Sequence, residues 1–382
     1  MTIPAPVPST ATPTPASLTP EALQPAFDAL AREVAAGDLP AGVLAVADRR
    51  GLIRLGAIGP GRERVTPRSR FMIASITKPI FATGVLQLAE DGRLDLDRPV
   101  TADLPEFRPP PAVPGQAGGE AITPRTILCH TAGLDEDWER IRRERPSAQR
   151  IYEALCSTPL RYAPGSRFRY TSNSWFVLGR LVERLSGIPY PRLLQERVLE
   201  PLGMADTGFE LPGHDRAPVH GFGPHPRQIP IYVRLFARLA HPAGGLWSTA
   251  PDVLRFGQAM LAGGELAGRR VLGAGWLSEM TRSQTEGLVD DEEPGREPHY
   301  ALGWGRSGLD PGRPGSVAVF DHGGSSAGRL WVDPQVGLVV VMLANRWGSS
   351  SRHALAVIGT VYDILGVARP SGSAASEPSG GR

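Results

Sequence analysis

Residues 73–79 read Ile-Ala-Ser-Ile-Thr-Lys-Pro, which places a hydroxyl at Ser75 and an amine at Lys78, three positions apart. Positions i and i+3 share one face of a helix, so we expect the two side chains to lie side by side. Lys78 is the only lysine among the 41 lysines and arginines of the chain. A desolvated lysine amine can lose its proton, whereas an arginine guanidinium stays charged. The stretch therefore predicts a serine that is activated by a neighbouring amine.

The sequence after Ser75 indicates where this helix begins. Apolar residues recur with helical spacing as far as a stop at Gly92. Pro79 is tolerated only in a first turn, where amide hydrogens have no partner within the helix, so the helix begins near Ser75. The Ser75 hydroxyl would then face the positive end of the helix dipole. A serine three positions before a lysine is also common on solvated helix surfaces, so the spacing alone does not establish function.

Composition excludes several classes of function. The chain has 41% hydrophobic and 21% charged residues and a net charge of +2, which is typical of a soluble globular protein with no electrostatic preference for nucleic acid. The longest strongly apolar run, residues 336–344, is too short to cross a membrane. Residues 1–20 lack the pattern of an export signal, so we expect a cytoplasmic protein with no membrane contact.

The sequence indicates one domain between two tails. Residues 1–19 and 367–382 are rich in Pro, Ala, Thr, Ser and Gly, and we expect both to be disordered. Residues 20–366 show no internal repeat and read as a single α/β (α+β) domain. Helices are expected near its two ends, at 20–36 and 350–365, and strands at 42–48, 52–58, 316–320, 329–332 and 338–343.

These elements predict an antiparallel sheet built from both ends of the chain and flanked by the terminal helices. The mostly helical residues 76–240 would be inserted beside the sheet, with Ser75 at the floor of a cleft between the two parts. Residues 213–243 are interpreted as a wall of that cleft. Residues 281–299 are interpreted as a surface loop.

Two further segments carry groups that a serine and lysine pair needs. Tyr170 stands just before a predicted apolar helix, where a phenol beside an ammonium can carry protons, although a tyrosine among apolar residues is also an ordinary packing residue. Residues 320–326, Phe-Asp-His-Gly-Gly-Ser-Ser, follow a predicted strand. Their glycines permit close approach of a substrate, and the amides of Ser325 and Ser75 could together hold an oxyanion. Alone, this segment would be read as a plain turn.

Taken together, in this order and spacing, the three segments resemble the serine hydrolases of the class C β-lactamase and family VIII carboxylesterase group. Further runs that look like that group are 128–134 (Leu-Cys-His-Thr-Ala-Gly-Leu), 201–204 (Pro-Leu-Gly-Met), 243–249 (Ala-Gly-Gly-Leu-Trp-Ser-Thr) and 300–304 (Tyr-Ala-Leu-Gly-Trp). The resemblance implies the fold shared by β-lactamases and penicillin-binding proteins.

The resemblance also implies roles for individual residues. Ser75 would be the nucleophile, Lys78 and Tyr170 the acid and base, and the amides of Ser75 and Ser325 the oxyanion hole. Which of Lys78 and Tyr170 takes the first proton stays open. The substrate would contact the residues Ser172, Asn173, His322, Gly323 and Gly324. Neither a metal nor an organic cofactor is implied, and the oligomeric state stays open.

Departures from the group's pattern bear on the substrate. Penicillin-recognising sites commonly have Lys-Thr-Gly where this chain has His322 and two glycines, so a fixed cation is lost. Ser172 stands where lactamases usually have Asn, with Asn173 displaced by one position. Both changes favour a small-molecule carboxylic ester as substrate over β-lactams or D-amino-acid peptides. Arg329 could restore a cation nearby, which keeps the β-lactamase and amidase alternatives open.

Two other interpretations remain. Residues 324–328, Gly-Ser-Ser-Ala-Gly, fit a nucleophile elbow centred on Ser326, but that motif needs a helix next, and 329–332 reads as a strand. The chain could also be a non-catalytic relative that binds a ligand in the same fold. Retention of Lys78 in a chain without any other lysine argues against lost chemistry.

Overall fold

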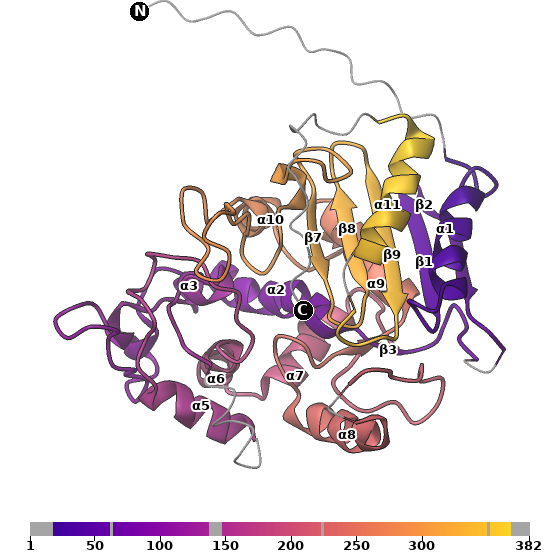
Figure 1. Ribbon diagram of the computed structural model, residues 1–382. Helices are drawn as coiled ribbons and strands as arrows, with labels where there is room; N and C mark the ends of the chain where they lie inside the picture. Colours follow the sequence, from indigo (N-terminus) through magenta and orange to yellow (C-terminus); the bar gives the residue numbers. More distant parts are fainter. Residues whose placement is uncertain (1–17, 62–63, 137–146, 223–224, 350–351, 368–382) are drawn as a thin grey trace, which may run out of the picture.

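The computed structural model describes residues 18–61, 64–136, 147–222, 225–349 and 352–367. The predicted tails at 1–19 and 367–382 lie outside these residues, apart from positions 18, 19 and 367. The described part forms a layered α/β structure with a helical region beside its sheet (Figure 1).

The sheet has five antiparallel strands in the order β2-β1-β9-β8-β7. These strands are β1 (Gly42–Asp48), β2 (Gly51–Ile58), β7 (Phe320–Gly323), β8 (Arg329–Asp333) and β9 (Leu338–Ala344). Strand β1 pairs along its whole length with β9, from Gly42 opposite Ala344 to Asp48 opposite Leu338. The prediction of an antiparallel sheet built from both ends of the chain is therefore confirmed.

One strand was predicted at the wrong position. The sequence indicated a strand at 316–320, but β7 begins only at Phe320. The Asp333 carboxylate accepts hydrogen bonds from the Ser316 amide at 2.9 Å and the Ser316 hydroxyl at 2.6 Å. Those side-chain bonds hold residues 316–319 in a turn, which competes with extended pairing.

Helices cover both faces of the sheet. On one face lie α1 (Gln24–Ala35) and α11 (Arg352–Leu365), and on the other lies α9 (Ala250–Leu261) (Figure 1). Alternate residues of β9 face the two layers: Val340 and Met342 pack with the terminal helices, while Val339 and Val341 pack with the α9 side. Burial on both faces explains why β9 is apolar throughout rather than alternating.

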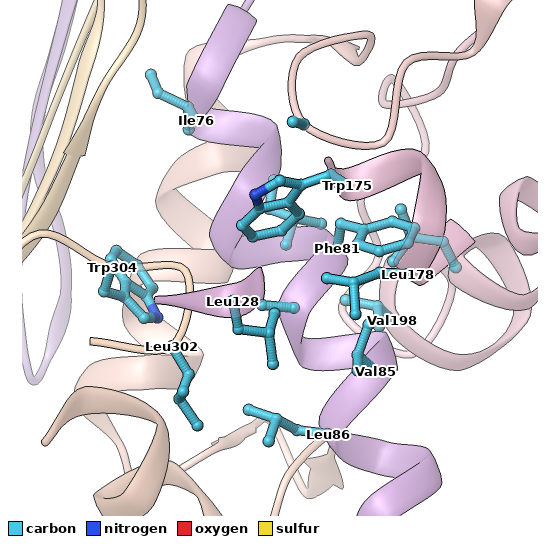
Figure 2. Packing of buried hydrophobic residues seen from close by; sticks show 14 of the residues in the cluster. Ile76, Phe81, Val85, Leu86, Leu128, Trp175, Leu178, Val198, Leu302 and Trp304 are labelled. Carbon is cyan, nitrogen blue, oxygen red and sulfur yellow. The ribbon is translucent and has the colours of Figure 1, made fainter. Parts of the chain in front are cut away.

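The remaining elements include the helix α2 (Thr77–Glu90). The others are α3 (Pro124–Leu128), α5 (Ala148–Ser157), α6 (Trp175–Ser186), α7 (Tyr190–Leu194), α8 (Ile229–Leu239), α10 (Ala274–Thr281), and the short strand pairs β3 (Phe71–Met72) with β4 (Trp247–Ser248) and β5 (Glu265–Leu266) with β6 (Arg269–Arg270). Of these, α6, α7 and α10 contact α2. Every residue of α2 except Glu90 is buried. Figure 2 shows Phe81 and Val85 of this helix among the side chains of the surrounding helices. Because α2 is buried on all sides, any polar side chain that it carries is shielded from water.

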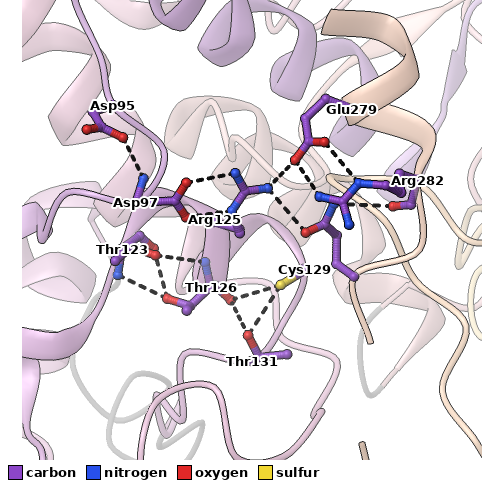
Figure 3. A network of polar contacts seen from close by, with 10 residues as sticks. Asp95, Asp97, Thr123, Arg125, Thr126, Cys129, Thr131, Glu279 and Arg282 are labelled. Atoms are coloured by element: carbon purple, nitrogen blue, oxygen red, sulfur yellow. Dashed lines mark hydrogen bonds and ion pairs between the residues drawn. The ribbon is translucent and has the colours of Figure 1, made fainter. Parts of the chain in front are cut away.

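A polar network fixes α3 to its neighbours (Figure 3). Arg125 donates to both carboxylate oxygens of Asp97, at 2.6 and 2.9 Å, and to Glu279 of α10. At the start of α3, Thr123 and Thr126 form a reciprocal capping box. Because these contacts hold α3 in place, they also fix the position at which the following loop, residues 129–136, begins.

Gly257 provides a test of the packing between α9 and the sheet. A Cβ atom at this position would lie 2.6 Å from Val339 Cγ1 and 2.9 Å from Leu330 Cδ1, which is too close for van der Waals contact. We expect Gly257→Ala to lower the free energy of unfolding by about 1–3 kcal/mol, measured by urea denaturation, because the strands must shift to accept the methyl group. Gly275→Ala in α10 is the matched control, since a methyl group there would have no described neighbour within 4 Å. There the same change should be neutral or stabilise by up to about 1 kcal/mol, and equal effects at both positions would contradict the packing argument.

Candidate active site

Ser75 lies at the junction of the sheet and the helical region. It belongs to a one-turn 3-10 helix, η1 (Ala74–Ile76), which runs directly into α2. The preceding Ala74 has φ +49°, a left-handed conformation that costs free energy in a residue other than glycine. Strain of this kind persists only where the surrounding packing enforces it, and here it presents a half-buried Ser75 at the start of a buried helix.

Lys78 lies beside Ser75, as the spacing predicts. Its Nζ is 3.3 Å from Ser75 Oγ, 3.2 Å from Ser172 Oγ and 3.3 Å from the Ala243 carbonyl oxygen. Three acceptors match the three N–H bonds of an ammonium. When the amine is neutral, two N–H bonds can still serve Ser172 and Ala243, and the lone pair then faces Ser75.

The surroundings of Lys78 favour the neutral amine. Its side chain is 0% exposed, and burial lowers its pKa from 10.5 to about 7, an effect that the negative charge of Glu136 partly opposes. The Nζ atom also lies 4.4 Å from the centre of the Tyr170 ring. At neutral pH a substantial fraction of Lys78 therefore has a lone pair to accept a proton.

Tyr170 lies at the same point but holds its proton tightly. Burial raises the pKa of its hydroxyl, and the nearby Ser75 hydroxyl opposes that rise only in part. Apart from this contact with Ser75, the buried Tyr170 oxygen has no hydrogen-bond partner among the described residues. Tyr170 is thus a protonated phenol next to the Ser75 hydroxyl at neutral pH, with its own hydroxyl available to an incoming group.

The turn between β7 and β8 brings backbone amides towards Ser75. A Cβ atom at Gly324 would lie 2.5 Å from the Ile73 carbonyl oxygen, so only glycine allows this approach. The next residue, Ser325, is exposed on the turn. Within the described ranges, neither the Ser75 nor the Ser325 amide donates a hydrogen bond to another group, which leaves both free for a substrate oxygen.

His322 is neutral and is held by Tyr300. Its Nδ1 donates to the Gly323 carbonyl oxygen at 2.8 Å, so its Nε2 accepts from the Tyr300 hydroxyl, also at 2.8 Å. Burial, followed by the charge of Lys78, lowers the pKa of His322 to about 3. The position that commonly carries a lysine in penicillin-recognising sites therefore carries no cation here.

A cavity of about 510 Å³ opens onto these groups. Of the sequence-predicted site residues, those that line it are Ser75, Tyr170, His322, Gly323, Gly324 and Ser325. Much of the remaining lining is charged, including Arg329, whose guanidinium pairs with the buried Asp321 carboxylate.

The walls of this cavity differ from the sequence-based interpretation. Residues 281–299, interpreted as a surface loop, contribute Asp290, Glu292 and Arg296 to the lining. Residues 213–243, interpreted as a wall, include no residue that lines the cavity in the part of the segment that the structure describes. They line a separate cavity of about 210 Å³ beside α8 instead. Polar loops lack the periodicity from which a cavity wall could be recognised.

Two of the predicted substrate-binding residues lie beneath the cavity surface. The Ser172 hydroxyl accepts a hydrogen bond from Lys78, while the Asn173 side chain is buried and its Oδ1 lies 3.2 Å from His241 Nε2. Neither residue is part of the cavity lining.

The structure does not support a nucleophile elbow at Ser326. This residue is buried in the turn between two strands, and β8 follows where the motif needs a helix.

Sequence reasoning missed Glu136, a buried carboxylate at the back of the site. Its Oε1 accepts hydrogen bonds from the amides of Ser172 at 2.5 Å, Asn173, and Ser174 at 3.3 Å. Among the described residues, a cluster with ligand atoms close enough to hold a metal ion consists of Glu33, Asp38 and His353, which lie in or just after the terminal helices and not at Ser75. His353 Nδ1 there lies 2.5 Å from Glu33 Oε2, in a contact that joins α1 to α11.

A family model described as Beta-lactamase matches residues 27–359. Esterase EstB of Burkholderia gladioli is 31% identical over 335 residues, covering 76% of this chain and 82% of that protein. The D-alanyl-D-alanine-carboxypeptidase/endopeptidase AmpH of Escherichia coli (strain K12) is 27% identical over 299 residues, covering 75% of this chain and 74% of that protein.

Solved structures share the fold. EstCE1, described as a hydrolase with promiscuous acyltransferase activity, superposes with a TM-score of 0.75 at 23% identity, covering 90% of this chain and 99% of that one. A family VIII carboxylesterase superposes with a TM-score of 0.72 at 20% identity, covering 91% of this chain and 99% of that one. In the described residues, no helix combines the length and apolar character needed to cross a membrane.

The single lysine makes the protonation of Lys78 directly measurable. Protein grown with lysine carrying carbon-13 at Cε should give one side-chain resonance from the chain, provided that any affinity tag is free of lysine. Because burial lowers the pKa of Lys78 to about 7, we expect a titration midpoint near pH 7 in the folded protein. In denaturant, the midpoint should return to about 10.4. A folded-state midpoint above about pH 9 would contradict the buried placement of the amine.

Proposed function

The chain belongs to the Beta-lactamase family, and from this premise we propose that it is a serine hydrolase that cleaves small-molecule carboxylic esters through an acyl-enzyme on Ser75. The observation that carries the proposal is the 3.3 Å contact between the fully buried Lys78 amine and the Ser75 hydroxyl. A nucleophile within hydrogen-bond reach of a base is the arrangement that covalent catalysis requires.

In the first step, Lys78 is the base and Tyr170 is not. With its pKa at about 7, Lys78 is partly unprotonated at neutral pH, whereas the raised pKa of Tyr170 keeps the phenol protonated. The Ser75 oxygen forms a bond to the ester carbonyl carbon as its proton passes to Lys78 Nζ. The carbonyl π electrons move to the carbonyl oxygen, which becomes the oxyanion of a tetrahedral intermediate.

The intermediate then collapses to the acyl-enzyme. The amides of Ser75 and Ser325 stabilise the oxyanion. As the carbonyl re-forms, the bond to the alcohol oxygen breaks, and that oxygen receives a proton from the Tyr170 hydroxyl, which Lys78 reprotonates. Water repeats the sequence on the acyl-enzyme, so that the acid leaves and Ser75 is restored.

Electrostatics favour neutral esters over anionic β-lactams and peptides with a terminal carboxylate. His322 is neutral at physiological pH, and the charge of Arg329 in the cavity wall is already paired with Asp321. A substrate carboxylate would therefore meet no free cation at these two positions. The name of the esterase relative agrees with this preference, while the carboxypeptidase relative shows that the family also includes enzymes that act on peptides.

Substitution of the two candidate serines tests the nucleophile. We expect Ser75→Ala to reduce hydrolysis of p-nitrophenyl butyrate by at least about a thousandfold, because no other described hydroxyl lies against the amine with access to the cavity. Ser326→Ala, the matched control in the β7–β8 turn, should retain most activity. Mass spectrometry of a trapped adduct should locate the label on Ser75, and loss of labelling in Ser326→Ala alone would contradict the assignment.

A comparison of substrates tests the ester preference. We expect kcat/KM for p-nitrophenyl butyrate to exceed that for nitrocefin by at least about a hundredfold, since the lactam carboxylate meets no free cation at His322 or Arg329. Lys78→Ala should abolish both activities if both use one site. Efficient cleavage of nitrocefin by the unaltered protein would instead favour the β-lactamase alternative.

A further inference from the structure

Glu136 joins two parts of the site that are distant in sequence. The loop at 129–136 leaves the anchored helix α3 and contacts the turn at 170–174 at both of its ends. At one end, His130 Nδ1 accepts a hydrogen bond from the Thr171 amide at 3.1 Å. At the other end, one oxygen of Glu136 accepts from three successive amides, those of Ser172, Asn173 and Ser174. The turn that carries Tyr170 and Ser172 is therefore held from behind by this loop.

Three amides directed at one oxygen stabilise a charged carboxylate. Burial raises the pKa of Glu136, while the three amides and the charge of Lys78 oppose that rise. Glu136 is only 5% exposed, so its negative charge is poorly screened by water.

The other titratable groups around Lys78 are either uncharged or paired with an opposite charge. The side chains of His130, His241 and His322 have pKa values lowered by burial and then by the charge of Lys78. Burial likewise raises the pKa values of the Tyr170 and Tyr300 hydroxyls, so both stay protonated. Asp321, next to His322, is paired with Arg329. Of the described carboxylates, Glu136 alone has a charge that shifts the protonation of Lys78.

We propose that Glu136 is a positioning residue of the reaction: it fixes the turn that carries Tyr170 and Ser172, and it supplies the negative charge that lets the buried Lys78 amine accept the proton of Ser75. This inference rests on the proposed function, in which Lys78 is the base.

The charge of Glu136 matters most after the proton has moved from the Ser75 hydroxyl to the Lys78 amine. A buried ammonium without a counter-charge is costly, so Lys78 would be a weak base if burial acted alone. Ser172 links the two charges, because its amide donates to Glu136 while its hydroxyl accepts from Lys78. The ammonium formed during attack is thus stabilised through a path of hydrogen bonds already in place, and Glu136 need not contact the substrate.

Glu136→Gln removes the negative charge of residue 136 while keeping the size and shape of its side chain. The carboxamide oxygen can still accept from the three amides, so the turn should keep its position while the negative charge is lost. We expect the titration midpoint of the single Lys78 resonance to fall by about one pH unit or more. The acidic limb of kcat/KM for p-nitrophenyl butyrate should move to lower pH by the same amount, and the plateau should fall because a weaker base transfers the proton less readily.

The control is Glu265→Gln, the same chemical change on an exposed residue of β5, which should leave the midpoint and the profile unchanged. An unchanged or raised Lys78 midpoint in folded Glu136→Gln overturns the inference. A lowered midpoint with an unmoved acidic limb supports the charge coupling but overturns the assignment of Lys78 as base, so failure of the proposed function is distinguishable. If Glu136→Gln does not fold, Glu136→Asp replaces it: its shorter side chain keeps the charge but withdraws the carboxylate from the three amides, so kcat/KM should fall, and an unchanged kcat/KM there overturns the positioning role.

Discussion

The site depends on the removal of one amine from water. Lys78 lies on a helix that is buried along almost its whole length, so the packing of α2 against the sheet and the surrounding helices determines the protonation of this residue. An exposed lysine at the same distance from Ser75 would stay charged at neutral pH and could not accept a proton. The chemistry of this family member is therefore a property of its core as much as of its cavity.

Burial of Lys78 creates a second requirement. When the amine accepts a proton, the charged ammonium that forms must also be stabilised in the absence of water. The loop after α3 meets it by placing Glu136 behind the turn at 170–174, where backbone amides rather than a side-chain cation hold the carboxylate. The histidines around Lys78 stay neutral and add no competing positive charge. The site thus combines one buried amine with one buried carboxylate, and Ser172 lies between them and bonds to both.

The sequence predicted those features of the fold and site that depend on residues close together in the chain. The spacing of Ser75 and Lys78 and the position of Pro79 located the start of α2, and apolar runs located β1 and β9. Local sequence also pointed to Tyr170 and Ser325, but it left a packing residue and a plain turn as alternative interpretations, and the resemblance to known hydrolases was needed to prefer the functional ones. Glu136 could not be predicted, because its partners lie 36 to 38 positions away and are backbone amides in an irregular turn. The inward direction of the Asn173 side chain likewise depends on His241, a contact without any sequence signal.

The pairing of β1 with β9 also affects how the protein is made. Residue 42 lies opposite residue 344, and the turn that brings Ser325 towards Ser75 belongs to the same late segment. During synthesis on the ribosome, β1 can pair with β2 early, but it must wait for nearly the whole chain before β9 exists, which makes this pairing a slow, long-range step of folding. A chain that ends before residue 325 would carry Ser75 and Lys78 but lack β8, β9 and the Ser325 amide, so the arrangement around Ser75 can be completed only when synthesis is almost finished.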